Sequence, residues 1–143
     1  MDTIRWYQAS MLLLCALVTS HSFAQQEQSH LDSLDTIKIE KLTGVKGKLD
    51  TAKNVFKISV PRTDLAVTVA GVKMIPPMGL TSWAAFKSAG DQVMVMGDMV
   101  LQEQQVNPVL SIALNNGIEV TALHNHFLWD TPKVMFMHIG GIG

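Results

Sequence analysis

The stretch that decides the fold is EVTALHNHFLWDTPKVMFMHIGG, residues 119–141. Together with Ile118 it forms two largely apolar runs, residues 118–126 and 133–140, in which side chains alternate as they do in strands. A short segment, residues 127–132 with Asp130 near its centre, separates the runs. The pattern therefore predicts two antiparallel strands joined as a hairpin, with the even-numbered residues of the first strand on one face.

Three of the five histidines of the chain lie in this hairpin: His124, His126 and His138. A turn centred near Asp130 would place His124 opposite Phe136, and His138 diagonal to His124. Diagonal neighbours on paired strands are about 7–8 Å apart at Cα, so long side chains can reach one ligand. A slip of one residue would instead move His138 to the other face.

A His-x-His pair plus a third histidine is a candidate metal site, because imidazole nitrogen is a good ligand for zinc and copper. Three histidines with an open position are also the form of a catalytic zinc site. We therefore predict that His124, His126 and His138 bind Zn or Cu, or a small ligand. The alternative is that they are structural, half-buried and hydrogen-bonded to the backbone or to Asn125.

Two carboxylates are candidate supporting groups, Asp98 and Glu119. Asp98 follows Gly97 in an otherwise apolar run, where an acid must be paired, bulged toward solvent or functional. Glu119 would point away from the histidines if its strand is regular. Asp130 is expected to be a turn residue.

Methionines suggest a second metal chemistry, because thioethers bind Cu(I). Five lie in two of the apolar runs: Met94, Met96, Met99, Met135 and Met137. We favour a core role for them, since methionine fills irregular cores.

Composition excludes some classes of protein. The chain has 143 residues and a formal net charge of −1, so nothing indicates nucleic-acid binding. Its single cysteine, Cys15, lies in the N-terminal apolar run, so metal chemistry elsewhere must use His, carboxylate, Met or water. There is no G-x-S-x-G motif and no phosphate-binding glycine loop. Whether the protein is an enzyme is left open.

Residues 1–24 have the layout of a secretory signal peptide, with Arg5, a short apolar run and Ser-Phe-Ala before the cleavage site. The run is shorter than the 20 or so residues that span a bilayer, and an uncleaved anchor is the alternative. We expect an exported protein, periplasmic or extracellular after cleavage near Ala24. Residues 25–32 would be a polar lead-in, and residues 33–143 a single domain.

The rest of the chain predicts helices and strands in turn. A short helix would be capped by Asp32 or Ser33 and end at Gly44. A second helix would begin with Asn107 as N-cap and Pro108 at its first position, and end at Asn116-Gly117.

Between the helices, the predicted strands are residues 54–60, a pair around Ala70-Gly71, and a hairpin of residues 80–88 and 92–102 around Gly90. Residues 82–86 could instead be helical. The order indicates an α+β fold, a largely antiparallel sheet with two helices packed on one face.

The segments SVPRTDLAVTVAGV, MGDMVLQEQQVNPVLSIALNNGIEVTALHNH and MFMHIGG together resemble the DUF1259 family, also called LppY/LpqO, of exported bacterial proteins and lipoproteins. The resemblance runs from about Leu34 to Gly141 and implies no established activity.

Longer members of that family look like two related halves, and this chain resembles one of them. The resemblance therefore implies a short member or a truncated product that uses a partner copy. Self-association through the C-terminal strand is the expected route.

Overall fold

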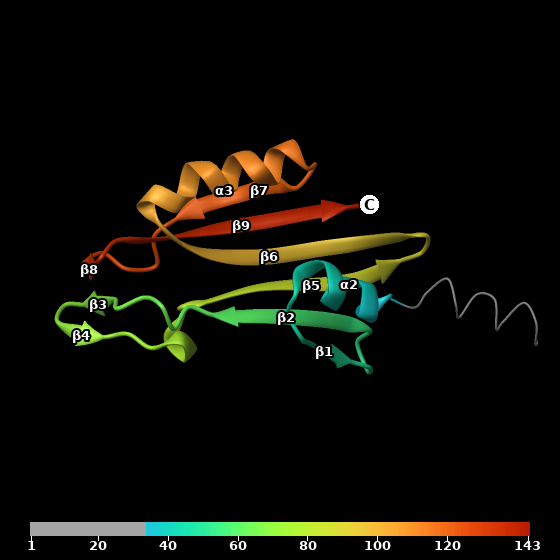
Figure 1. Cartoon of the computed structure of the whole chain (residues 1–143), viewed down its shortest axis with the longest axis horizontal. Helices are drawn as coiled ribbons and strands as arrows, with labels where there is room; N and C mark the ends of the chain where they lie inside the picture. Colours follow the sequence, from blue (N-terminus) through green and yellow to red (C-terminus); the bar gives the residue numbers. More distant parts are fainter. Residues whose placement is uncertain (1–33) are drawn as a thin grey trace, which may run out of the picture. The chain divides into compact units, whose positions relative to one another are not determined.

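The computed structural model describes residues 34–143, and a six-stranded sheet dominates this part of the chain (Figure 1). The strands are β1 (Gly47–Asp50), β2 (Val55–Pro61), β5 (Thr81–Ala89), β6 (Gln92–Gln102), β7 (Glu119–His124) and β9 (Val134–Ile142). Their order is β1-β2-β5-β6-β9-β7, and every neighbouring pair is antiparallel. The predicted signal peptide and lead-in lie outside the described residues.

A second, smaller sheet lies at one end of the large one (Figure 1). Its strands are β3 (Thr68–Val69), β4 (Val72–Lys73) and β8 (Asp130–Thr131), in the order β4-β3-β8. Ala70 and Gly71 both have positive φ, 50° and 83°, as a two-residue hairpin turn requires. The predicted strand pair is therefore confirmed, and a 3-10 turn, η1 (Pro76–Met78), follows it.

Helix α3 (Glu103–Asn115) connects β6 to β7 and lies against β6, β7 and β9 (Figure 1). The predicted start at Asn107 and Pro108 is wrong, because Pro108 lies inside the helix. Gln102 is the N-cap, and its side chain accepts from the N–H of Gln105. The Gln105 side chain accepts in return from the Gln102 N–H at 2.9 Å. Because of this reciprocal cap, α3 begins at Glu103, before the position that Pro108 alone would indicate.

Helix α2 (Thr36–Thr43) begins at Asp35, whose carboxylate accepts from the Lys38 N–H at 2.9 Å. The predicted caps, Asp32 and Ser33, are therefore wrong, whereas Gly44 ends the helix as expected, with φ 69°. No helix within residues 34–143 is long and apolar enough to cross a membrane. The α+β class is confirmed, and packing of both helices on one face stays a prediction.

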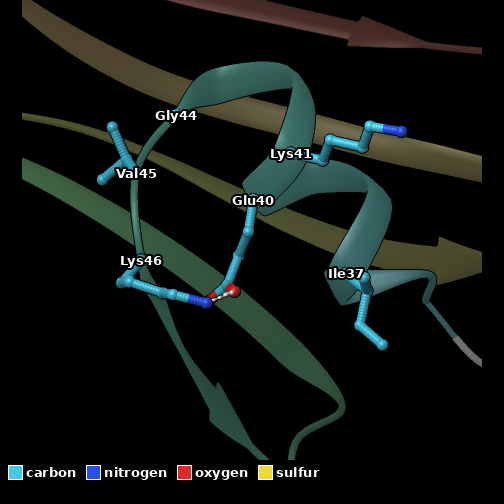
Figure 2. A pocket seen from close by; sticks show the side chains of 6 residues that line it. All are labelled: Ile37, Glu40, Lys41, Gly44, Val45 and Lys46. Carbon is cyan, nitrogen blue, oxygen red and sulfur yellow. Dashed lines mark hydrogen bonds and ion pairs between the residues drawn. The ribbon is translucent and has the colours of Figure 1, made fainter.

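The Glu40 side chain fastens the end of α2 to the start of β1. Its two oxygens accept from Lys46 at 2.6 Å and from the Gly47 N–H at 2.9 Å. Figure 2 shows the Glu40–Lys46 pair. Both residues line a cavity of about 380 Å³. The Lys46 side chain is 91% exposed, so solvent screens this pair strongly and it contributes little to stability.

The hairpin around Gly90 is confirmed, and the alternative helix over residues 82–86 is wrong because β5 runs through them. Where the β5–β6 ladder ends, the buried Ser82 hydroxyl accepts from the Val100 N–H at 2.9 Å. A side chain thus replaces a missing backbone partner, as buried N–H groups require.

The main core lies where the small sheet meets β6 and β9. Its buried members are Leu65, Val67, Met74, Leu80, Val100, Val134 and Phe136. Met137 is also fully buried, so the core role predicted for the methionines is confirmed there. That role is wrong for Met94 and Met96, which are 40% and 55% exposed.

One side of the large sheet, which we call the open face, carries two rows of residues that cross its strands. The first row is Lys48, Lys57, Ala85, Met96 and Gly140. The second row is Ser59, Trp83, Asp98, His138 and Ala122. Partners in antiparallel strands point to the same side, so the second row leads from β2 directly to His138.

The last strand, β9, is central in the sheet, with β6 on one side and β7 on the other. The open edges of the large sheet within residues 34–143 are therefore β1 and β7. Self-association of the chain stays a prediction.

Candidate functional site

Asp98, His124, His126 and His138 gather at one end of the open face, and we call these four residues the His–Asp cluster. The register of β7 and β9 pairs Ala122 with His138 and His124 with Phe136, which confirms the predicted hairpin register. On the other side of β9, His138 is paired with Asp98 of β6. The pairing of β9 with β7 and with β6 thus brings His124 and the more distant Asp98 next to His138.

His124 and His138 face each other through their Nε2 atoms, which are 3.1 Å apart. Their ring planes are almost perpendicular, at 89°. At this distance one Nε2 must carry the proton and the other must accept it, because two protonated or two bare nitrogens would repel each other. The two imidazoles therefore share one proton, which lies in the hydrogen bond between their Nε2 atoms.

His126 lies beyond the end of β7, and the prediction that the strand continues through it is wrong. Its ring stacks on Phe136, with centroids 3.4 Å apart and planes at 8°, and is 5.0 Å from the His124 ring. Burial lowers the pKa of His126; Asp98 opposes this shift, and His124 and His138 add to it. A lowered pKa favours neutral imidazole, the form that binds metals.

Asp98 is the least satisfied member of the cluster. Its side chain is 13% exposed, and Oδ2 lies 3.8 Å from Nε2 of His138. Within residues 34–143, its other oxygen, Oδ1, is buried and has no hydrogen-bond partner. A buried carboxylate oxygen without a partner is destabilising. The sequence predicts that Asp98 is paired, bulged toward solvent or functional. The structure shows that its Oδ1 atom is the one without a partner among the described residues.

Two other carboxylates from the sequence do not join the cluster. A bulge between Val120 and Ala122 pairs Glu119 with Gly140, so the predicted regular strand is wrong at this point. The exposed Glu119 side chain makes no ion pair with a histidine within the described residues. Asp130 is a buried structural residue, and its carboxylate accepts from Lys133 at 2.7 Å and from the Val134 N–H at 2.8 Å.

The cluster is not a finished metal centre as it stands. Across residues 34–143, no three His, Cys, Asp or Glu side chains form a group that could hold an ion. Within the cluster, the imidazoles of His124 and His138 are already in contact. The Asp98 carboxylate lies beside them, and His126 is stacked against Phe136.

Trp83, the residue opposite Asp98, was not recognised as part of this neighbourhood from the sequence. The signal was present, because a hairpin that turns at Gly90 aligns residues 83 and 98. The contact between Asp98 and His138 had no such signal, since α3 and β7 separate β6 from β9 in the chain.

Comparisons with known proteins agree with the resemblance seen in the sequence. No curated protein and no solved structure matches the chain. A family model described as Domain of Unknown Function (DUF1259) matches residues 37–143, which is almost all of the described part. With most of its length covered by that model, including every residue of the His–Asp cluster, the chain belongs to the DUF1259 family.

Proposed function

We propose that this domain binds a divalent transition-metal ion, Zn²⁺ or Cu²⁺, through the His–Asp cluster. The observation that carries the proposal is the 3.1 Å distance between Nε2 of His124 and Nε2 of His138. Two nitrogens bound to one tetrahedral zinc ion, at about 2.0–2.1 Å each, are about 3.3 Å apart. The two nitrogens are therefore already at about the separation that a shared ion needs, and binding would turn the rings so that both lone pairs point at the ion.

Asp98 supports the same proposal through its chemistry. A cation near the carboxylate would give the partnerless Oδ1 a partner, and two imidazoles with one carboxylate are a common ligand set for transition metals. His126 is the candidate fourth group, once its ring turns away from Phe136. A bound ion with an open position would supply Lewis acidity. The proposal concerns metal binding alone and assigns no catalytic residue.

A specific observation favours a second candidate, an exported partner-binding protein in which the histidines are structural. The stack of His126 on Phe136 and the contact of His124 with His138 hold the cluster together without an ion. Leu128 and Trp129, next to the cluster in sequence, are 76% and 72% exposed and could contact a partner. Export, in both proposals, is supported by the signal-peptide pattern of residues 1–24.

Zn²⁺ and Cu²⁺ affinities, measured by competition with a chromophoric chelator, test the metal proposal. We expect His124→Ala and His138→Ala each to weaken binding by at least about a hundredfold, and Asp98→Asn by about tenfold to a hundredfold. Glu119→Gln is the matched control, because it removes a carboxylate charge from the same sheet outside the cluster. It should leave the affinity unchanged.

The result that rejects metal binding is a wild-type protein that takes up no more ion at saturation than the His124→Ala/His138→Ala variant. If that result comes with a large loss of stability in His126→Ala, measured in the presence of a chelator, the structural role of the histidines is the better account.

A further inference from the structure

A groove on the same open face has no role in the metal proposal. It has a volume of about 840 Å³, within the usual range of about 300–1,000 Å³ for small-molecule sites. Apolar residues line part of the groove. Its polar lining consists of three lysines, one acid and two hydroxyl side chains: Lys48, Lys53, Lys57, Asp50, Thr51 and Ser59. The strands β1 and β2 and the turn between them form this groove.

The positive charge in the groove is only partly neutralised. Asp50 is paired with Lys53, at 3.5 Å. Within residues 34–143, neither Lys48 nor Lys57 has a carboxylate oxygen within 4.0 Å of its amine. These two lysines are direct partners in the β1–β2 register, and like charges at such positions destabilise a sheet. An anion between them would remove that repulsion.

One contact holds the Lys57 side chain, and another holds the turn at the rim of the groove. The Lys57 amine lies 4.2 Å from the centre of the Trp83 ring, a cation–π contact that keeps it on the open face. Lys87, opposite Val55 in the next strand, donates to the Lys53 carbonyl at 2.8 Å and anchors the rim. With a net charge of −1 for the whole chain, this basic surface is a local feature.

We propose that the groove binds the phosphate monoester group of a ligand, between Lys48 and Lys57. A phosphate dianion matches two ammonium charges that have no carboxylate partner in residues 34–143, and lysine binds phosphate as a point charge. The hydroxyls of Thr51 and Ser59 are available as further donors. Among the described residues that line the groove there is no arginine, the side chain that favours planar, two-point recognition of carboxylate.

The groove and the His–Asp cluster are neighbours on the open face. Lys57 and Asp98 are two strands apart and in adjacent rows, a separation of about 12 Å from the strand spacing and rise. One extended ligand could therefore reach both, although phosphate binding does not depend on the metal. The two proposals can fail independently.

The test is calorimetric titration of the full chain with inorganic phosphate and with glycerol phosphate, in low salt and a chelator. We expect saturable binding that weakens by about threefold to tenfold in Lys57→Gln and in Lys48→Gln, and that falls further as salt is added. Lys73→Gln, which removes an equal charge from the small sheet, is the matched control and should bind as wild type does.

Vesicles separate the two sources of such a group. Binding to phosphatidic acid vesicles, lost in Lys57→Gln and absent with neutral vesicles, identifies a lipid headgroup; binding of soluble esters alone identifies a small metabolite, and both support the site. The proposal is overturned if wild type shows no saturable phosphate binding, or if Lys73→Gln weakens binding as much as Lys57→Gln does. Since Zn²⁺ affinity is measured separately, neither result bears on the metal site.

Discussion

At the scale of single residues, two aspartates show how position decides what a carboxylate does. Asp98 lies on the open face with a buried oxygen that has no partner in the described chain. Asp130 is buried, yet both of its oxygens are used, one by Lys133 and one by the Val134 N–H. The Asp98 carboxylate therefore lacks a partner at one oxygen within the described chain, whereas the Asp130 carboxylate fixes the segment that leads from His126 into β9.

Asp130→Asn is expected to lower the free energy of unfolding by about 1–2 kcal/mol at pH 7, because a charge-assisted contact becomes a neutral one. Burial raises the pKa of Asp130, but its bonds to Lys133 and Val134 outweigh this, and the net shift is downward from 3.8. A lowered folded-state pKa gives stability that is present above the unfolded pKa and lost as pH falls through the folded pKa.

The difference in the free energy of unfolding between wild type and Asp130→Asn should therefore be constant from pH 7 to about 5, and should shrink below about pH 4. Urea unfolding of both proteins at several pH values measures it. A difference that does not change with pH down to 3 would contradict the role given to the charge of Asp130.

At the scale of the strands, Gly97 explains why the run before Asp98 contains a glycine. A Cβ added at Gly97 would lie 2.6 Å from the Trp83 carbonyl oxygen and 3.0 Å from the Ile139 side chain. The backbone of β6 thus needs glycine for a close approach of its neighbours. The same approach sets the position of the next residue, Asp98, against Trp83 and His138.

Gly97→Ala is expected to destabilise the protein by about 1–3 kcal/mol, since the nearest obstacle is backbone and cannot turn away. Gly140→Ala is the matched control in β9, where the nearest atom would be 3.7 Å from the added Cβ, an ordinary contact. Thermal or urea unfolding compares the two. Equal stabilities would show that β5 and β6 are not held as close as the structure has them.

At the scale of the whole domain, the His–Asp cluster joins three strands that are separated along the chain. Asp98 belongs to β6, His138 to β9, and His124 to the end of β7. An ion bound to all three would have no equivalent set of ligands in an unfolded chain. Metal binding should then add to the stability of the entire sheet.

A protein saturated with Zn²⁺ at a hundred times its Kd is expected to gain about 2.7 kcal/mol in the free energy of unfolding. For a domain of this size the melting temperature should rise by roughly 10 °C. Differential scanning fluorimetry with Zn²⁺, and then with excess chelator, measures the shift. The His124→Ala/His138→Ala variant should show no rise, and an equal rise in that variant would place the metal elsewhere.

The sequence by itself determined those features that depend on neighbours along the chain. Alternation and the turn near Asp130 were enough to predict that His124 faces Phe136 and that His138 lies diagonal to His124. Turn chemistry likewise placed Gly44, Ala70-Gly71 and Gly90. Local rules failed at the start of α3, where the side chains of Gln102 and Gln105 form a reciprocal cap, and at the bulge beside Glu119.

Only the tertiary structure decided which side chains meet across the sheet. The pairing of Asp98 with His138, and of Lys57 with Trp83, joins strands whose order no local pattern specifies. The physical reason is that strand order is set by the burial of a shared core, here around Phe136, and that burial is a property of the folded chain. The histidines of residues 119–141 and the candidate carboxylate Asp98 were thus visible in the sequence, whereas the position of Asp98 beside His138 was not.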